Sequence, residues 1–195
     1  MIKRIFDLLS SLVGLIILSP LLMLISLLII IDSKGNAFYS QKRVGRKGNQ
    51  FNLLKFRTMK QNSDIKGLLT IGKDSRITRI GHYLRKSKLD EIPQLINIIR
   101  GDMSVVGPRP ETPNYVELYT EEQQKVLNVR PGLTDYASLE FINESETLAK
   151  HDDPEKAYIE TIMPQKLSLN LQYIRDQSLL IDIKIIFKTL LRILT

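Results

Sequence analysis

The N-terminal part of the chain is dominated by one long run of apolar residues. Residues 8–31, LLSSLVGLIILSPLLMLISLLIII, contain no charged side chain. As a straight helix these 24 residues extend for about 36 Å, which exceeds the roughly 30 Å thickness of the hydrocarbon core of a bilayer. The pattern therefore predicts a membrane helix over this run.

Two features of the run favour a helix that enters the membrane and returns to the same side. Ser19 and Pro20 stand in its middle, and proline kinks a helix because it lacks a donor N–H and clashes with an earlier carbonyl. Each half is then only about 18 Å long, too short to span. Positive charge marks the cytoplasmic side, and it flanks both ends of the run: Lys3 and Arg4 before it, and Lys34, Lys42, Arg43, Arg46 and Lys47 after it. We therefore expect a re-entrant helix–break–helix, with a kinked spanning helix as the open alternative.

The rest of the chain predicts a small hairpin followed by helices. Apolar and polar residues roughly alternate over residues 38–44 and 51–56 around the turn GRKGN, which predicts a β-hairpin within residues 37–59. Apolar residues at helical spacing predict helices over residues 74–89, 91–101, 111–128 and 154–174. The predicted class is α+β, mostly α, with residues 1–36 as the membrane element and residues 37–195 as one further domain.

The C-terminal segment SLLIDIKIIFKTLLRIL, residues 178–194, is strongly apolar. Its basic residues Lys184, Lys188 and Arg192 recur every four positions and form a single stripe. This pattern is typical of an amphipathic helix that lies in a membrane interface. A core helix with one solvated face is the alternative.

Charge is distributed unevenly along the chain. Residues 1–110 carry 19 Lys and Arg against 7 Asp and Glu, a balance of +12, whereas residues 111–195 carry 9 against 14, a balance of −5. A basic half indicates an anionic partner such as acidic lipid or a phosphorylated small molecule. The chain has no tryptophan and few aromatic residues near its basic ones, which argues against nucleic acid. It has no cysteine, so disulfides and cysteine-based metal sites are excluded.

Residues 89–93, LDEIP, place two carboxylates side by side. Pro93 suits the first turn of a helix, which puts Asp90 near the N-cap and Glu91 in the first turn, where the helix dipole favours negative charge. Ser87 and Asp90 also have capping-box spacing. On this interpretation the pair is simply the start of a helix.

The charged surroundings favour a functional site instead. Arg85 and Arg109 are close in sequence, the latter between two prolines in VVGPRPE, and arginine binds phosphate well. An ionised aspartate beside guanidinium groups and Mg²⁺ is equipped for phosphoryl transfer, and it can attack phosphorus to form an acyl phosphate. A hard cation such as Mg²⁺ suits carboxylate and phosphate oxygens.

Several stretches resemble the monotopic phosphoglycosyl transferases, a family of bacterial sugar transferases. They are QKRVG, FNLLKFRTM, VRPGLT and the long block GHYLRKSKLDEIPQLINIIRGDMSVVGPRPE, which spans residues 81–111. The resemblance implies transfer of a sugar 1-phosphate from a UDP-sugar to polyprenyl (undecaprenyl) phosphate, with release of UMP, at the first membrane step of glycan assembly. It also implies Mg²⁺ as cofactor, a lipid bilayer as partner, and a catalytic domain on the cytoplasmic face of the bacterial inner membrane.

The family's functional positions can be carried over residue by residue. The resemblance implies that Asp90 is the nucleophile that forms a phosphosugar intermediate and that Glu91 helps to bind Mg²⁺. Arg109 would hold phosphate, and Ser19 and Pro20 would form the break in the re-entrant helix. Further candidates for phosphate binding, from their charge and position, are Arg85, Lys55 and Arg57, and for the last two a solvated strand face is the alternative.

One segment departs from the family pattern. Many members continue after VRPGLT with Gly-Trp and a polar stretch, whereas residues 135–146 here read DYASLEFINESE. The sequence therefore leaves the sugar open, along with the oligomeric state, for which a homo-oligomer is one option. Two rival functions also stay open: an enzyme in which Asp90 is a general base in a ternary complex, and a non-catalytic membrane module that binds acidic lipid or a glycan-assembly partner.

Overall fold

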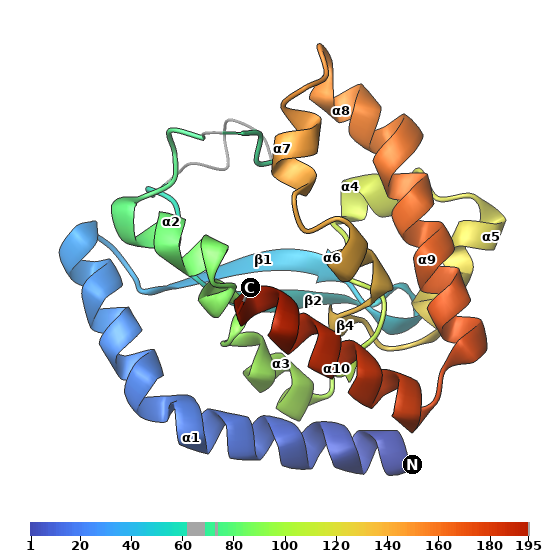
Figure 1. Ribbon diagram of the computed structural model, residues 1–195, viewed down its shortest axis with the longest axis horizontal. Coiled ribbons are helices and arrows are strands. Elements are labelled where there is room, and N and C mark those ends of the chain that lie inside the picture. Colours follow the sequence, from blue (N-terminus) through green and yellow to red (C-terminus); the bar gives the residue numbers. More distant parts are fainter. Residues whose placement is uncertain (62–68, 73, 195) are drawn as a thin grey trace.

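The computed structural model describes residues 1–61, 69–72 and 74–194 as a mostly helical protein with two small sheets and one long apolar N-terminal helix (Figure 1). The α-helices are α1 (Ile2–Asp32), α2 (Arg79–Lys86), α3 (Gln94–Arg100), α4 (Pro113–Val116), α5 (Glu121–Gln124), α6 (Tyr136–Glu140), α7 (Glu144–Leu148), α8 (Pro154–Ala157), α9 (Met163–Asp176) and α10 (Leu179–Leu194). The strands are β1 (Phe38–Val44), β2 (Gln50–Phe56), β3 (Ser104–Val106) and β4 (Gly132–Thr134). Single turns of 3₁₀-helix cover Arg46–Gly48, Leu89–Glu91 and Lys125–Asn128, and a π-helical turn, Tyr158–Ile162, joins α8 to α9.

Helix α1 is long and apolar enough to cross a membrane by length and composition. It continues through Pro20 as one helix, and Figure 1 shows that it bends part-way along its length. The Ser19 hydroxyl donates to the carbonyl of Ile16 at 2.9 Å, so one carbonyl near the proline keeps a partner. The predicted break is therefore a bend within a continuous helix, and re-entry into the membrane stays a prediction.

Both ends of α1 pack against the rest of the protein. Ile25 and Ile29 are buried with Phe56 and Leu84 in one hydrophobic cluster. At the other end, Asp7 and Ser11 are the buried residues of the first three turns. The middle of the helix exposes large apolar side chains, among them Leu12, Val13, Ile16, Ile17, Met23 and Leu24.

The predicted hairpin is confirmed. Strands β1 and β2 pair antiparallel from Phe38 opposite Phe56 to Val44 opposite Gln50. Leu53 and Phe56 lie on opposite faces of β2 and belong to two different clusters of the core. The hairpin thus connects the end of α1 to the helices that follow it.

The helix predicted over residues 111–128 is wrong in extent. The chain forms α4, then α5, then a 3₁₀ turn, because Thr120 starts a new helix. Its hydroxyl accepts from the Gln123 amide, and the Gln123 side chain accepts from the Thr120 amide, a complete capping box. The helix predicted over residues 154–174 is present as α8, the π-helical turn and α9. The helix predicted over residues 74–89 is present only in its second half, as α2, because Thr78 caps its start by accepting from the Gly81 amide. The helices predicted over residues 91–101 and 178–194 are present as α3 and α10.

Strands β3 and β4 pair in parallel, with Ser104 opposite Gly132 and Val106 opposite Thr134. Just beyond the sheet the two backbones nearly touch: a Cβ placed on Gly132 lies 2.1 Å from the Gly107 nitrogen. Only glycine allows such a close approach. This contact fixes the start of the turn that carries Arg109.

Helix α10 packs one face on this sheet. Ile185 is buried with Val106 and Tyr173, and the hydroxyls of Thr189 and Thr134 lie 2.7 Å apart. Its other face exposes Leu180, Ile183, Phe187 and Leu190, and Lys184, Lys188 and Arg192 are exposed as well.

Candidate active site

The two carboxylates of LDEIP lie in a turn between two helices. Helix α2 ends at Lys86, and Lys88 adopts a left-handed conformation with φ of 56° that reverses the chain direction. Asp90 and Glu91 then form a 3₁₀ turn and are both buried, with 6% and 9% of their surface exposed. Burial of two neighbouring carboxylates requires compensation by positive charge or hydrogen bonds.

The capping prediction for Asp90 is wrong. Helix α3 begins at Gln94, with Pro93 in the N-cap position and no capping hydrogen bond from a side chain. The Ser87 hydroxyl donates to the carbonyl of Tyr83 at 2.8 Å, so it does not complete a capping box with Asp90. The pair is therefore not explained by the start of a helix.

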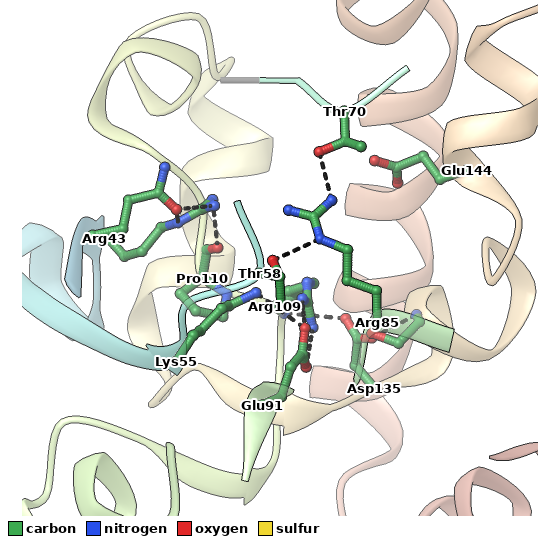
Figure 2. Close-up of polar contacts among 12 residues, drawn as sticks. Arg43, Lys55, Thr58, Thr70, Arg85, Glu91, Arg109, Pro110, Asp135 and Glu144 are labelled. Atoms are coloured by element: carbon green, nitrogen blue, oxygen red, sulfur yellow. Dashed lines mark hydrogen bonds and ion pairs between the residues drawn. The ribbon is translucent and has the colours of Figure 1, made fainter. Parts of the chain in front are cut away.

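Glu91 is held by two cations from distant parts of the chain. The Arg109 guanidinium donates to both of its carboxylate oxygens, with Nη1 3.1 Å from Oε2. The Lys55 ammonium on β2 donates to Oε1 at 3.1 Å. Figure 2 shows the two basic side chains converging on this one carboxylate. Burial acts to raise the pKa of Glu91, but Arg109 and Lys55 outweigh it and hold that pKa well below the usual range.

Asp90 has different surroundings. Its Oδ1 atom is buried and has no hydrogen-bond partner in the part of the chain that the structure describes. Burial raises the pKa of Asp90, and the positive charge of Lys55 offsets only part of that effect. A buried, unpartnered carboxylate oxygen is costly in a folded protein, and such groups occur where a ligand or reaction needs them.

Arg85 provides a third cation close to the pair. Its guanidinium donates to the hydroxyl of Thr58 at 2.8 Å and to that of Thr70 at 2.9 Å (Figure 2). Burial lowers the pKa of Arg85, while the charge of Asp90 acts to raise it. These contacts leave Asp90 within the field of Lys55 and Arg85, with Arg109 held on Glu91 beside it.

Comparison with known proteins identifies the family of this chain. The sequence model of the family described as bacterial sugar transferase matches residues 1–195. The chain belongs to the bacterial sugar transferase family.

Curated relatives of this bacterial sugar transferase come from several organisms. The exopolysaccharide production protein ExoY of Rhizobium meliloti is 35% identical over 97% of this chain and 84% of its own length. The undecaprenyl-phosphate glucose phosphotransferase of Komagataeibacter xylinus is 39% identical over 97% of this chain but only 35% of its own length. The UDP-glucose:undecaprenyl-phosphate glucose-1-phosphate transferase of Escherichia coli is 33% identical over 98% of this chain and 40% of its own length. The chain thus resembles one part of the two longer relatives.

One residue predicted at the site of this sugar transferase lies elsewhere. The Arg57 guanidinium donates to the carbonyls of Ser33, Lys34, Gly35 and Asn36. It therefore satisfies backbone carbonyls of the segment that connects α1 to β1. These contacts occupy the Arg57 guanidinium away from the carboxylate pair. The predicted cations close to the pair are Lys55, Arg85 and Arg109.

Sequence reasoning missed the residue that fixes the Arg109 turn. Asp135 is fully buried, and its Oδ2 accepts from the Arg109 amide at 3.1 Å. Its Oδ1 accepts from the Ser138 amide at 2.6 Å and so caps α6. The available signal was an aspartate three residues past a glycine and just before a helical pattern, which indicates an N-cap. Its second bond, to Arg109, depends on the fold and could not be found locally.

Proposed function

We propose that this protein is a phosphoglycosyl transferase that moves a sugar 1-phosphate from a UDP-sugar to polyprenyl (undecaprenyl) phosphate and releases UMP. The names of relatives from Komagataeibacter xylinus, Aeromonas hydrophila and Escherichia coli describe transfer of a sugar phosphate to undecaprenyl phosphate. Membership of the family supports the same class of reaction here. The UDP-sugar donor is inferred from the names of the Aeromonas hydrophila and Escherichia coli relatives, and the covalent route from the site.

The observation that carries the proposal is the buried, unpartnered oxygen of Asp90. Next to it, Glu91 binds Arg109 and Lys55, so the cations that could neutralise Asp90 are partly engaged. A carboxylate in this condition is less stabilised than one in water, which favours its reaction with an electrophile brought in with positive charge around it.

The proposed reaction has two displacements at one phosphorus atom. In the first, an Asp90 carboxylate oxygen attacks the sugar-linked phosphorus of the UDP-sugar, the phosphoanhydride bond breaks, and UMP leaves with the bonding electrons. In the second, a phosphate oxygen of the polyprenyl phosphate attacks the same phosphorus, and the bond to Asp90 breaks. The products are the polyprenyl diphosphate sugar and the regenerated carboxylate. Arg85, Lys55 and Arg109 stabilise the negative charge of the phosphoryl groups during both steps.

The donor atoms fit Mg²⁺ bound together with substrate. Within residues 1–61, 69–72 and 74–194, no three His, Cys, Asp or Glu side chains lie close enough to hold a metal ion by themselves. Mg²⁺ is commonly bound through one or two carboxylates, waters and substrate phosphates, and Glu91 beside the unpartnered oxygen of Asp90 can supply the carboxylates. When bound, the ion neutralises charge on the diphosphate of the donor.

The contacts of α1 support a particular arrangement in the membrane. Arg4 in its first turn donates to carbonyls of α3 at 2.6 and 3.0 Å, whereas Ile29 in its last turns is buried with Phe56 and Leu84. A straight helix of this length separates its ends by about 45 Å, yet both ends contact the same folded body. This supports a helix that dips into the bilayer at its exposed middle and returns, with the site on the cytoplasmic face of the inner membrane. The apolar face of α10 and its basic stripe lie in the same interface on this proposal.

Intact mass spectrometry tests the proposal directly. Purified protein is incubated with a panel of UDP-sugars and Mg²⁺ in the absence of lipid acceptor. We expect a mass increase of one sugar phosphate, with release of UMP, and we expect Asp90→Asn to abolish both. Asp176→Asn, at an exposed position at the end of α9, is the matched control and should form the adduct normally.

The other outcomes distinguish the rival functions. A ternary-complex enzyme forms product only when polyprenyl phosphate is added and never yields the adduct. A non-catalytic lipid-binding module yields neither adduct nor product. An adduct that persists in Asp90→Asn contradicts the assignment of the nucleophile.

A further inference from the structure

The first two turns of α1 carry polar residues that contact the elements supporting the active site. We propose that Asp7, in the apolar membrane helix, is a positioning residue for catalysis that holds β3 and so sets the position of Arg109. This inference rests on the proposed function, because it concerns the rate of the same reaction.

Asp7 is 2% exposed, and both of its carboxylate oxygens have partners on β3. Oδ2 accepts from the Ser104 hydroxyl at 2.8 Å, and Oδ1 accepts from the Val105 amide at 3.0 Å. Ser104 is 1% exposed, so these contacts are shielded from water. Hydrogen bonds to a buried charged group are strong and directional, and together these two fix the position of β3 along the helix.

Strand β3 leads directly to the cation of the site. Arg109 follows Val106, the last residue of β3, after Gly107 and Pro108. The proline restricts the backbone, and Gly107 is in close contact with the backbone of Gly132. Because residues 107–108 are constrained in this way, a shift of β3 relative to α1 should move Arg109 by a similar amount.

The same end of α1 also holds the element that follows the carboxylates. Arg4 donates to the carbonyls of Ile98 and Ile99 in the last turn of α3, the helix that follows Glu91. Asp7 lies one turn further along α1 from Arg4. Arg4 and Asp7 thus bind α3 and β3, the elements next to Glu91 and Arg109 in the chain.

A second contact strengthens this arrangement. The Lys3 ammonium donates to Asp182 of α10 at 2.5 Å. Asp182 accepts at 2.6 Å from the hydroxyl of Tyr173, which in turn lies 3.2 Å from the carbonyl of Val106. The end of β3 is therefore connected to α1 from two sides.

A purely structural role predicts something different for Asp7. A structural role alone would appear as a loss of stability, because a buried donor left without its acceptor destabilises the fold, and it would leave the rate of the folded enzyme unchanged. Both carboxylate oxygens of Asp7 accept from the short strand β3 and not from groups within α1. We therefore expect its loss to change the rate of reaction more than the stability of the fold.

Asp7→Asn tests this, because the two carboxylate acceptors of Ser104 and Val105 are reduced to one neutral amide oxygen, and the other position becomes an NH₂ group that can only donate. We expect kcat for UMP release to fall about tenfold to a hundredfold, the range that misplacement of a reacting group by about 1 Å produces, with a small change in KM for the UDP-sugar. The matched control is Ser26→Ala, which removes only a hydrogen bond within α1, to the carbonyl of Leu22, and should keep the wild-type rate. The membrane-bound fraction should stay close to wild type in both variants. The melting temperature in detergent should be unchanged in Ser26→Ala and fall modestly in Asp7→Asn, where a buried donor loses its charged acceptor.

A double-mutant cycle with Arg109→Lys shows whether the effect passes through Arg109. If Asp7 acts by positioning that side chain, Asp7→Asn should lower the rate of adduct formation by less than about twofold in the Arg109→Lys background, since coupled residues are not additive. An equal effect in both backgrounds, or wild-type kcat in Asp7→Asn, overturns the proposal.

A second variant covers the case in which Asp7→Asn does not fold. Ser104→Ala removes one of the two donors and should show the same dependence on Arg109, and full additivity there overturns the proposal as well. Lack of UMP release by the wild-type protein with every donor refutes the proposed function instead, so the two failures are distinguishable.

Discussion

Asp90 and Glu91 are neighbours in sequence, but the fold gives them opposite electrostatic surroundings. Burial raises the pKa of Asp90, whereas Arg109 and Lys55 overcome burial and lower that of Glu91. Glu91 therefore stays charged and organises the cations, while Asp90 keeps an oxygen that has no partner among the described residues. A division of roles between adjacent carboxylates is a common outcome of such differences.

Glu111 allows a test of pH dependence away from the carboxylate pair. It accepts from Arg43 at 2.9 Å, from the Thr112 amide at 2.7 Å and from the Tyr158 hydroxyl. Burial acts to raise the pKa of Glu111, but Arg43, Lys166 and the Tyr158 hydroxyl outweigh it and lower that pKa below 4.5. The charged form therefore adds stability above pH 4.5, and this contribution is lost as the pH falls through the lowered pKa.

We expect Glu111→Gln to reduce the free energy of unfolding near neutral pH by roughly 1.5–3 kcal/mol, the usual contribution of a hydrogen bond to a charged group. The melting temperature of wild type and variant, measured from pH 7 downwards, should converge in acid. Glu122→Gln is the control, because its ion pair with Lys125 is exposed and such pairs contribute little. A difference between wild type and Glu111→Gln that is constant with pH contradicts the assignment.

At the residue scale, the sequence identified the charged groups of the site but not their contacts. Asp90, Glu91, Lys55, Arg85 and Arg109 were all candidates, and the structure brings them together. The capping role of Asp90 was wrong because Lys88 turns the chain with a positive φ, which is rare for a residue with a side chain and leaves no local pattern. The contacts of Asp7 and Asp135 join positions about 100 and 26 residues apart, beyond the reach of any spacing rule.

At the scale of elements, the β3–β4 sheet is the support of the Arg109 turn, and Gly132 is its most constrained position. Gly132→Ala places a Cβ 2.1 Å from the nitrogen and 2.3 Å from the oxygen of Gly107, so the strands must separate. We expect a lower melting temperature and a loss of UMP release of about tenfold or more, since the turn moves with the strand.

Gly14→Ala is the control for this substitution. A Cβ there lies 3.3 Å from Leu95 Cδ1, the end of a flexible side chain, and alanine favours the helix. We expect wild-type activity and unchanged or slightly higher stability. Equal behaviour of the two glycine variants would show that the close approach at Gly132 does not govern the turn.

Elements with a strong local period were predicted, and those held by distant contacts were not. The hairpin and helices α2, α3 and α10 have clear alternation or helical spacing. Strands β3 and β4 have three residues each and pair across 28 positions of sequence, so neither shows a period of its own. The helix predicted over residues 111–128 ignored Thr120, whose capping box with Gln123 was visible in the sequence.

At the scale of the whole molecule, the contacts of both ends of α1 with one body make a prediction about topology. Tags at Met1 and Thr195 should both be protected when protease is added from the periplasmic side, because the proposed re-entrant helix places both on the cytoplasmic face. Dissolving the membrane with detergent should expose both tags, which is the control. Cleavage of the Met1 tag alone in intact membranes indicates a spanning helix and rejects re-entry.

The bond between Lys3 and Asp182 joins residues 179 positions apart, and it has a consequence for biosynthesis. Residue 3 leaves the ribosome long before residue 182. Lys3 therefore has no Asp182 to bind until α10 has been translated. Contacts of such long range form late and slowly. The transferase should therefore reach its active form only after translation is nearly complete. Until then, the membrane or a chaperone should be needed to keep the apolar side chains of α1 away from water.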